Sequence, residues 1–172
     1  MSAPTRVLFV CHANVCRSPM AEAIFRHLAC EAGVADAFEI DSAGVMALDG
    51  SPPHPHTVEV CAAHGIEASG AARQLMRADM FQPGHVLVAD GDNLRRLTAM
   101  MGGSAFGPIE GSPSRVRRLR EVLPTPRFAR AAARDVPDPV GGDLRAFGAC
   151  FALVHACCEA LLRELAPPNR AS

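Results

Sequence analysis

The sequence contains no lysine, tyrosine or tryptophan, so arginine fills all 17 of its Lys/Arg positions. We attach no function to this bias. The sequence also lacks an excess of charge of either sign, because 18 acidic residues balance those arginines to a formal net charge of −1. A chain without a basic excess gives no reason to expect nucleic acid or a membrane surface as a partner.

Long apolar runs, a leader and a disulfide pattern are also missing. No apolar run approaches the length of a membrane span, and the N-terminus lacks the basic-then-apolar pattern of a signal peptide. Seven cysteines are an odd number and do not predict a secreted disulfide framework, so a reducing cytoplasm is the expected location. The cysteine and histidine spacings fit none of the common zinc pairings, so we expect no metal and no cofactor.

The length and composition indicate one globular domain. A chain of 172 residues that is 49% hydrophobic and 20% charged is long enough to bury a core. We expect this domain to span residues 1–166 and to act as a monomer. Residues 167–172, which contain two prolines, are expected to form a disordered tail.

The order of apolar and amphipathic stretches predicts an α/β fold. The expected strands are Arg6–Val10, Phe38–Asp41, His85–Asp90 and Arg115–Leu119, and the expected helices are Pro19–Glu31, Pro55–Ala63, Arg77–Phe81, Asn93–Met101 and Gly142–Leu165. This order predicts a single-domain three-layer sandwich, a four-stranded parallel sheet with helices on both faces and ligand-binding loops after the carboxyl ends of the strands. Between strands, Gly102–Pro113 is expected to be a flexible connection, and the arginine-rich stretch Arg115–Arg120 a solvated face.

Residues 5–19, TRVLFVCHANVCRSP, carry the most specific chemical signal in the chain. The apolar run Val7–Val10 reaches Cys11, five residues separate Cys11 from Arg17, and Ser18-Pro19 opens a helix. A loop between a strand and a helix points several backbone N–H groups at one spot, with the positive end of the helix dipole behind them. The stretch therefore predicts an anion cradle with a thiol nucleophile at its floor, suited to attack on a phosphate ester.

Each residue type in this loop has a physical reason. The thiolate is the reactive form of Cys11, and surrounding N–H donors favour it. Arg17 can offer two parallel N–H donors to phosphoryl oxygens and remains charged at any working pH. Ser18 is expected both to cap the helix and to donate its hydroxyl to the thiolate, and Pro19 suits the first helical position. Asn14 tolerates the left-handed backbone that a tight anion loop needs.

The stretch Val7–His27 resembles the phosphate-binding loop of the low-molecular-weight protein tyrosine phosphatases. Further matches follow in that family's order at Asp41–Gly44, His64–Ile66, Ala72–Gln74, Val86–Asp90 with Asn93, and Asp135–Pro139, so that the resemblance covers about residues 5–165. It implies that phosphate, vanadate or arsenate occupies a loop made of Cys11, His12, Ala13, Asn14, Val15, Cys16, Arg17 and Ser18. The substrate would be a phosphorylated protein or peptide.

The resemblance also implies roles for residues outside the loop motif. Asp138, between two prolines, would act as general acid and then as general base, in a two-step hydrolysis through a phosphocysteine that needs no metal. Asp135 is the rival candidate, although it lies outside the Asp-Pro step. The family uses a cysteine at the position of Cys16 as a reversible disulfide partner of Cys11; Cys16 could equally be a small filler.

Substrate specificity remains open between several hypotheses. No aromatic residue follows Pro139, where tyrosine-specific members carry a wall for the substrate ring, and the sequence Val140-Gly141-Gly142 is more like a bacterial branch that includes protein arginine phosphatases. That branch carries Thr where this loop has Val15, which is the tyrosine-type residue. Phosphotyrosine hydrolysis is therefore the main hypothesis. The alternatives are a protein arginine phosphatase, a thiol-dependent arsenate reductase on the same loop, and a phosphoprotein-binding module with a degraded site.

Overall fold

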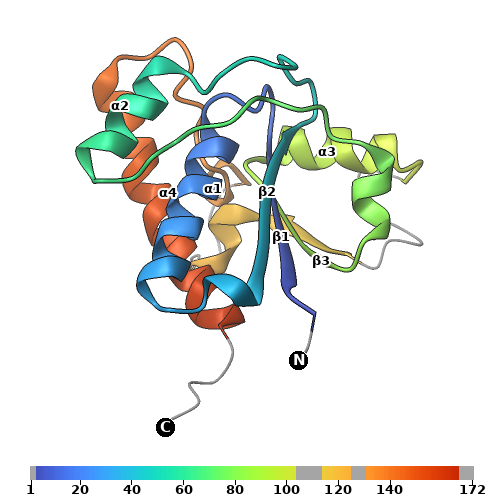
Figure 1. Cartoon of the computed structure of the whole chain (residues 1–172). Coiled ribbons are helices and arrows are strands. Elements are labelled where there is room, and N and C mark those ends of the chain that lie inside the picture. The colour runs from blue at the N-terminus through green and yellow to red at the C-terminus, as the bar shows by residue number, and fades with distance from the viewer. Residues whose placement is uncertain (1–2, 104–113, 125–130, 167–172) are drawn as a thin grey trace, which may run out of the picture.

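Four parallel strands form the centre of the fold (Figure 1). The computed structural model describes residues 3–103, 114–124 and 131–166. Within these residues the strands are β1 (Thr5–Cys11), β2 (Phe38–Gly44), β3 (Gly84–Val88) and β4 (Ser114–Arg118), in the spatial order β2-β1-β3-β4. Each neighbouring pair is parallel, which confirms the predicted sheet. The expected tail and most of the expected flexible connection (104–113) lie outside the described residues.

Helices cover both faces of this sheet, as predicted. On one face lie α1 (Arg17–Glu31), α2 (Pro55–Ala63) and α4 (Leu144–Leu165), and on the other lie α3 (Gly91–Met100) and the 3₁₀ helix η2 (Arg77–Phe81) (Figure 1). Three further short 3₁₀ helices are η1 (Ala35–Ala37), η3 (Leu119–Val122) and η4 (Ala131–Arg134). The result is the expected three-layer α/β sandwich.

The central strand β1 connects the two halves of the core. Val7 and Phe9 point into the cluster under α1 and α4, whereas Leu8 and Val10 point into the cluster under α3. Successive side chains of a strand alternate between faces, so a strand with helices on both sides must be apolar at every position. This is why the sequence of β1 is a continuous apolar run, and it fixes the direction in which the following loop leaves the sheet.

Some elements begin or end at different residues from those predicted. β2 continues to Gly44, because it stays paired with β1 as far as Cys11. The last helix begins at Leu144 and not at Gly142, because the side chain of Asp143 caps it by accepting a hydrogen bond from the Ala146 N–H at 3.1 Å. The most consequential difference is at the start of α1, which is described with the site below.

Helix α4 is long and largely apolar, although charged residues at Arg145, Glu159 and Arg163 interrupt its apolar sequence. Among the described residues, this one helix of 22 residues passes a test of length and apolar composition for a membrane span, a test that core helices of soluble proteins also pass. Its apolar side belongs to the core: Phe147, Phe151 and Val154 are buried in the cluster beneath α1. Its hydrophobicity is therefore accounted for by packing within the domain.

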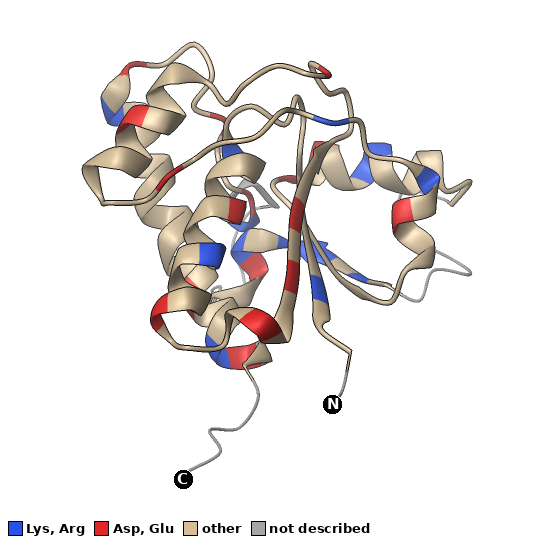
Figure 2. Cartoon of the chain, in the orientation of Figure 1, with Lys and Arg blue, Asp and Glu red and all other residues tan. Residues whose placement is uncertain are grey.

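The arginine-rich stretch at β4 is only in part the solvated face that the sequence predicted: Arg115 is exposed, whereas Arg117 and Arg118 are partly buried in ion pairs. Arg117 pairs with Glu164 of α4 at 2.8 Å, and Arg118 pairs with Glu121 and Asp135 at 2.8 and 3.2 Å. Figure 2 shows acidic and basic segments interspersed through the fold. These arginines thus connect β4 to its neighbours, because a strand at the sheet edge places alternate side chains against the helices on either side.

A chain of four charged side chains fastens the segment before η2 to the sheet. Arg6 of β1 and Arg73 both bind Asp79, at 3.1 and 3.0 Å, and Arg73 also binds Asp41 of β2 at 2.7 Å. Burial by itself would raise the pKa of Asp79. Hydrogen bonds from Arg73 and from the backbone N–H of Met76 outweigh burial and hold that pKa below its usual value.

This network predicts an acid-sensitive contribution to stability. We expect Asp79→Asn to lower the free energy of unfolding by about 3 kcal/mol at pH 7, because it leaves two arginines without their shared carboxylate. A carboxyl whose pKa is lowered by folding stabilises the fold above its unfolded pKa of about 4 and loses that effect as the pH falls through its folded pKa. The difference between wild type and variant, measured by urea unfolding at several pH values, should therefore shrink below about pH 4.

Asp92→Asn is the matched control, because Asp92 binds Arg95 and Arg96 on the exposed side of α3. Exposed pairs contribute less than about 1 kcal/mol, so this variant should remain close to wild type. Equal losses for both variants, or a loss at Asp79 that does not change with pH, would contradict the prediction.

Candidate active site

The loop between β1 and α1 forms the wall of a small hollow at the carboxyl edge of the sheet. The hollow has a volume of about 100 Å³ and is lined by Cys11, His12, Ala13, Val15, Cys16, Arg17, Asp138 and Val140. We call it the Cys11 hollow. Six of the eight predicted phosphate-binding residues line it, and the fold brings Asp138 to it from a position 121 residues beyond Arg17. The other two, Asn14 and Ser18, lie behind the loop and support it.

Asn14 holds the loop in shape from behind. Its φ is 58°, so the predicted left-handed conformation is confirmed. Its side-chain N–H₂ donates to the hydroxyls of Ser18 and Ser42 at 2.8 and 2.9 Å, and its carbonyl oxygen accepts from the Arg73 backbone N–H at 2.8 Å. The amide thus donates to residues of α1 and β2 and accepts from the segment that precedes η2. It fixes the loop relative to three parts of the fold at once.

Gly44 allows the loop to lie close against β2. A Cβ atom at this position would come within 2.7 Å of the His12 carbonyl oxygen, closer than a real side-chain carbon can be. The carbonyls of His12 and Ala13 are then free to accept hydrogen bonds from the N–H groups of Met46 and Leu48, at 2.9 and 3.1 Å. The loop after β2 therefore runs beside the loop between β1 and α1 and forms part of its surroundings.

Ser18 takes one of its two expected roles. Its hydroxyl lies 3.0 Å from the Cys11 sulfur, whereas the helix cap is Cys16, which makes no side-chain capping bond. The expected capping role of Ser18 is wrong, because α1 begins at Arg17 and Pro19 is its third residue. The Ser18 oxygen accepts from Asn14, and its hydrogen can point to the Cys11 sulfur at 3.0 Å or to the Ala43 carbonyl at 3.4 Å. When Cys11 is a thiolate it can only accept, so Ser18 is then the donor.

Arg17 is buried between two carboxylates. One end nitrogen donates to Asp90 at 2.6 Å and to the Val136 carbonyl at 3.1 Å, and the other donates to Asp138 at 2.7 Å. Burial alone would lower the pKa of Arg17, but the hydrogen bond to Asp90 and the neighbouring negative charges raise it, so the guanidinium stays charged. Its Nε–H is buried without a partner among the described residues.

Asp90 and Ser42 are the residues of this site that sequence reasoning did not single out. Asp90 lies two residues beyond the end of β3 and caps α3 by accepting a hydrogen bond from the Asn93 N–H at 2.7 Å. A carboxylate just past the carboxyl end of a strand adjacent to β1 was the signal that could have identified it as a partner of Arg17. Ser42 also lies in a stretch that was matched, but nothing local indicated its contact with Asn14.

The two candidate acids occupy different places. Asp138 lines the Cys11 hollow and binds Arg17. Asp135 accepts a hydrogen bond from the Gly91 N–H at 3.0 Å and binds Arg118, and it does not line that hollow.

Burial keeps most of the other thiols protonated. It raises the pKa of Cys16 to about 12, with smaller contributions from the charges of Asp138 and Cys11, and it raises the pKa of Cys150 to about 12 as well. Cys150 lies on α4 and is buried, as expected of a core cysteine, yet it is close enough to sense the charges of Arg17 and Asp138.

Comparisons with known proteins agree with this geometry. The family model described as low molecular weight phosphotyrosine protein phosphatase matches residues 6–170. A low molecular weight protein-tyrosine-phosphatase of Streptomyces coelicolor is 37% identical over 158 residues, which are 91% of this chain and 91% of that protein. The low molecular weight protein-tyrosine-phosphatase YfkJ of Bacillus subtilis is 36% identical over 162 residues, which are 92% of this chain and 94% of that protein.

Solved structures extend the comparison. The crystal structure of YfkJ superposes with a TM-score of 0.78 at 34% identity, and 95% of each chain is covered. A structure of the YwlE arginine phosphatase, a mutant with a phosphorylated active-site serine, superposes with a TM-score of 0.79 at 25% identity, covering 96% of this chain and 99% of the other. The fold and the sequence together place the chain in one class of hydrolase: it belongs to the low molecular weight phosphotyrosine protein phosphatase family.

The pKa values of the thiols predict selective alkylation. At pH 7 a thiol with a pKa of about 12 is ionised in about one molecule in 10⁵, so the thiols whose pKa is raised by burial should react very slowly. We expect iodoacetamide to modify Cys11, which is 2% exposed but lines the Cys11 hollow beside the Ser18 hydroxyl, and Cys30, which is exposed. The thiols expected to stay unmodified are Cys16, Cys61, Cys150, Cys157 and Cys158.

Peptide mass spectrometry at timed intervals measures this directly. Inorganic phosphate should slow the modification of Cys11 and leave that of Cys30 unchanged, so that Cys30 serves as the internal control. Modification of Cys16 as rapid as that of Cys30, or equal protection of Cys11 and Cys30 by phosphate, would contradict the prediction.

Proposed function

We propose that this chain hydrolyses phosphotyrosine in proteins, with Cys11 as nucleophile, Arg17 as phosphate-binding residue and Asp138 as general acid and base. The observation that carries the proposal is that these three side chains line one hollow at the junction of β1 and α1. Family membership supports the class of reaction. The names of the relatives from Streptomyces coelicolor and Bacillus subtilis support tyrosine phosphatase activity.

In the first step the Cys11 thiolate attacks phosphorus. A sulfur–phosphorus bond forms and the bond from phosphorus to the tyrosyl oxygen breaks, while protonated Asp138 gives its proton to the departing oxygen. The backbone N–H groups of the loop and the guanidinium of Arg17 bind the non-bridging oxygens, where negative charge is spread in the transition state. The buried Nε–H of Arg17, which has no partner among the described residues, would find its acceptor in the bound phosphate.

In the second step water replaces the thiolate. Asp138, now ionised, takes a proton from the water, the oxygen bonds to phosphorus, and the sulfur–phosphorus bond breaks to restore the Cys11 thiolate and release phosphate. The Ser18 hydroxyl donates to this sulfur and stabilises it as a leaving group. Every proton is accounted for by the chain's own residues, substrate and water. A reducing compartment such as the cytoplasm suits a reaction that depends on a free thiolate.

The ion pair between Arg17 and Asp138 defines the resting state. A bound phosphate dianion offers Arg17 a stronger acceptor, so Asp138 must leave Arg17 and take up a proton from solvent water before it can protonate the substrate oxygen. Asp90 remains on the other end nitrogen and keeps the guanidinium aligned. The mobile partner is thus the more exposed of the two carboxylates: the Asp138 side chain is 38% exposed and that of Asp90 is 20% exposed.

The lining of the hollow favours an aromatic phosphate ester. Val15, Ala13 and Val140 present apolar surface beside the place for phosphate, and Met46 and Leu48, both exposed, follow along the neighbouring loop. A phenyl ring has no N–H donors, so it leaves none unpaired against such a surface. A phosphoarginine guanidinium would leave N–H donors unpaired there, at a cost of about 1–3 kcal/mol each.

Phosphoarginine is the second candidate substrate. Its support is the structural likeness to the YwlE arginine phosphatase and the absence of an aromatic side chain at Val140. Arsenate reduction is less favoured, because it needs two further reactive cysteines near Cys11, and Cys16 and Cys150 have raised pKa values and are buried. A binding module without turnover is less favoured because all three proposed catalytic residues are present.

The role of Asp138 predicts a dependence on the leaving group. Asp138→Asn should lower kcat for an aryl phosphate with a poorly stabilised leaving group by about 10²–10⁴-fold, because that oxygen must be protonated as it departs. Formation of the phosphocysteine from an activated ester such as p-nitrophenyl phosphate should fall far less. Burst-phase kinetics separate this step from the later hydrolysis, in which Asp138 acts as base.

Asp135→Asn is the matched control, since Asp135 sits three residues away and contacts Gly91 and Arg118. It should leave the dependence on the leaving group as in wild type. The role of acid would belong to Asp135 if kcat fell in Asp135→Asn, by more for leaving groups of higher pKa, and did not fall in Asp138→Asn.

The apolar wall predicts a substrate preference that one side chain can change. The wild-type enzyme should have a higher kcat/KM for a phosphotyrosine peptide than for the matched phosphoarginine peptide. Val15→Thr should shift that ratio towards phosphoarginine by about ten-fold, because the hydroxyl can accept one of the guanidinium N–H groups. Val140→Tyr is the opposing variant and should lower KM for phosphotyrosine by providing ring contact. A wild-type preference for phosphoarginine would overturn the tyrosine assignment in favour of the second candidate.

A further inference from the structure

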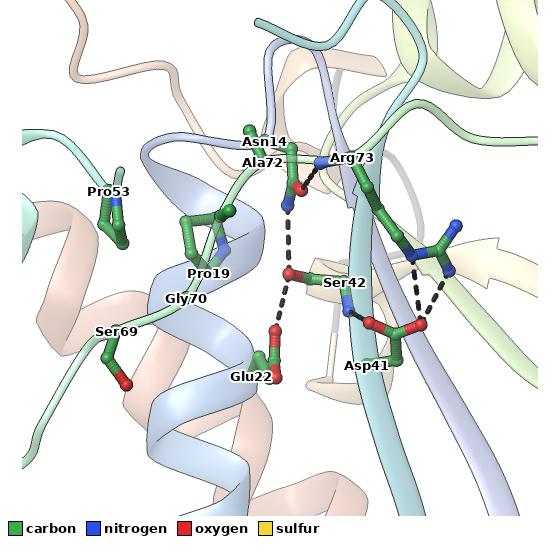
Figure 3. Close-up of a pocket in the computed structure, with 11 residues that line it drawn as sticks. Asn14, Pro19, Glu22, Asp41, Ser42, Pro53, Ser69, Gly70, Ala72 and Arg73 are labelled. Carbon is green, nitrogen blue, oxygen red and sulfur yellow. Dashed lines mark hydrogen bonds and ion pairs between the residues drawn. The ribbon is translucent and has the colours of Figure 1, made fainter. Parts of the chain in front are cut away.

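A second cavity lies behind the phosphate-binding loop, between α1, β2 and residues 69–73 (Figure 3). Its volume is about 190 Å³, and it is lined by Asn14, Pro19, Glu22, Asp41, Ser42, Pro53, Ser69, Gly70, Ala71, Ala72 and Arg73. We call it the Asn14 cavity. It has no lining residue in common with the Cys11 hollow, so it is a separate cavity on the other side of the loop, and Asn14 of that loop forms part of its wall.

A continuous series of hydrogen bonds joins this cavity to the thiol. Glu22 accepts from the Ser42 hydroxyl at 2.6 Å, and Ser42 accepts from the Asn14 amide at 2.9 Å (Figure 3). The same amide nitrogen donates to Ser18 at 2.8 Å, and the Ser18 hydroxyl lies 3.0 Å from the sulfur of Cys11. The carboxylate can only accept and the amide nitrogen can only donate, which sets the direction of the bonds among Glu22, Ser42, Asn14 and Ser18. The last bond runs from the Ser18 hydroxyl to the sulfur when Cys11 is a thiolate, because a thiolate can only accept.

In the Asn14 cavity, the carboxylate of Glu22 can accept more hydrogen bonds, whereas the N–H donors of Arg73 already have partners. Arg73 has five N–H donors, and all of them are directed to Asp41, Asp79 and the Gln74 carbonyl. Glu22 has one oxygen on Ser42 and the other on Arg26, a side chain that is 56% exposed. A carboxylate has about four lone-pair positions, so Glu22 can accept further hydrogen bonds.

Size and access limit what can bind. Sites for drug-sized ligands have volumes of about 300–1,000 Å³, so the Asn14 cavity suits a molecule of a few non-hydrogen atoms. An adjoining hollow of about 350 Å³ has Pro19, Glu22, Ser69 and Gly70 in common with it and is also lined by Ala23, Arg26 and Glu67. This hollow leads to the carboxylate of Glu22, whose side chain is 24% exposed. It adds the carboxylate of Glu67 and the guanidinium of Arg26 at the entrance. The carboxylates of the two hollows, Glu22, Asp41 and Glu67, then outnumber their arginines, Arg26 and Arg73, which favours a cation.

We propose that the Asn14 cavity binds a small planar nitrogen cation of the guanidinium or imidazolium type, which ion-pairs with Glu22 and changes the reactivity of Cys11 through Ser42, Asn14 and Ser18. The bound charge favours the thiolate at the far end of the hydrogen-bond series. An effect on turnover rests on the proposed phosphatase function, whereas binding and thiol reactivity do not.

The experiment measures binding and thiol reactivity separately. Guanidinium chloride and imidazolium chloride, at non-denaturing concentrations and about pH 6, are titrated into the full chain while the backbone amide resonances are followed by NMR. The same samples are treated with iodoacetamide, and the rate of modification at Cys11 is determined by mass spectrometry. Tetramethylammonium chloride at equal ionic strength is the control cation, because it carries charge without N–H donors.

In wild type we expect saturable shifts at residues 69–73 and a rise in the Cys11 modification rate of about two- to ten-fold. Tetramethylammonium should produce neither. Glu22→Gln should lose both effects. The matched control Glu67→Gln should keep both with weaker binding, because Glu67 lines the entrance and not the Asn14 cavity itself. Ser42→Ala should keep the saturable shifts and lose the rate effect, because Glu22 is present and the hydrogen-bond series is broken.

Several results would overturn the proposal. An absence of saturable shifts in wild type means that the cavity holds only water, and shifts that persist in Glu22→Gln mean that the cation binds elsewhere. Binding without a change in rate at Cys11 overturns the coupling. If Glu22→Gln fails to fold, Ser69→Phe tests the same point, since a ring at the cavity wall should prevent binding with the carboxylate intact. A chain that binds the cation but hydrolyses no phosphotyrosine refutes the proposed function and leaves this proposal standing.

Discussion

The side-chain amide of Asn14 is the contact on which the site depends. A loop that surrounds an anion must turn all its N–H groups inward, and a left-handed residue in the loop makes that turn possible. The strain of that conformation has to be offset, and the amide does so by bonding to Ser18, Ser42 and the backbone of Arg73. The contact also explains why β2 and the segment before η2 belong to the site, although neither reaches the Cys11 hollow.

The second constraint is the burial of a positive charge at the same place. A buried guanidinium is tolerated only when carboxylates accompany it, and Arg17 has Asp90 on one side and Asp138 on the other. The two carboxylates differ in how firmly the fold holds them. Asp90 caps α3 and lies two residues beyond the end of β3, whereas Asp138 lies in the proline-flanked segment before α4. In the proposed mechanism, that difference allows Asp90 to position the arginine while Asp138 is released for chemistry.

Both constraints rest on the sheet. β1 is central and buried on both faces, so the loop that follows it leaves from a rigid edge. β3 brings Asp90 and β2 brings Ser42 and Gly44 to the same region, since parallel strands end together. The Asn14 cavity lies where α1, β2 and the crossing segment 69–73 meet, and the hydrogen bonds that stabilise the loop also connect it to this cavity.

The sequence alone determined the local features of this protein. The apolar run before Cys11, the Cys-x₅-Arg-Ser-Pro spacing, the left-handed Asn14 and the bounds of α2 all follow from interactions within a few residues. The alternation of strands and helices was sufficient to predict the parallel sheet and its two layers of helices. The start of α1 was misplaced because Ser18 looks like a cap in the sequence, whereas its hydroxyl lies beside the sulfur of Cys11.

Only the tertiary structure decided which distant residues complete the site. Arg17 meets Asp90 and Asp138 across separations of 73 and 121 residues, and Asn14 meets Ser42 across 28. The arginines of β4 look like a solvated stretch in the sequence because their partners, Glu164 and Asp135, come from other elements. Hydrogen bonds and ion pairs act over a few ångströms in space, whereas sequence patterns report only neighbours along the chain. The sequence therefore predicted the chemistry of the loop. The residues that support the loop, the two carboxylates that pair with Arg17 and the cavity behind the loop became evident only from the tertiary structure.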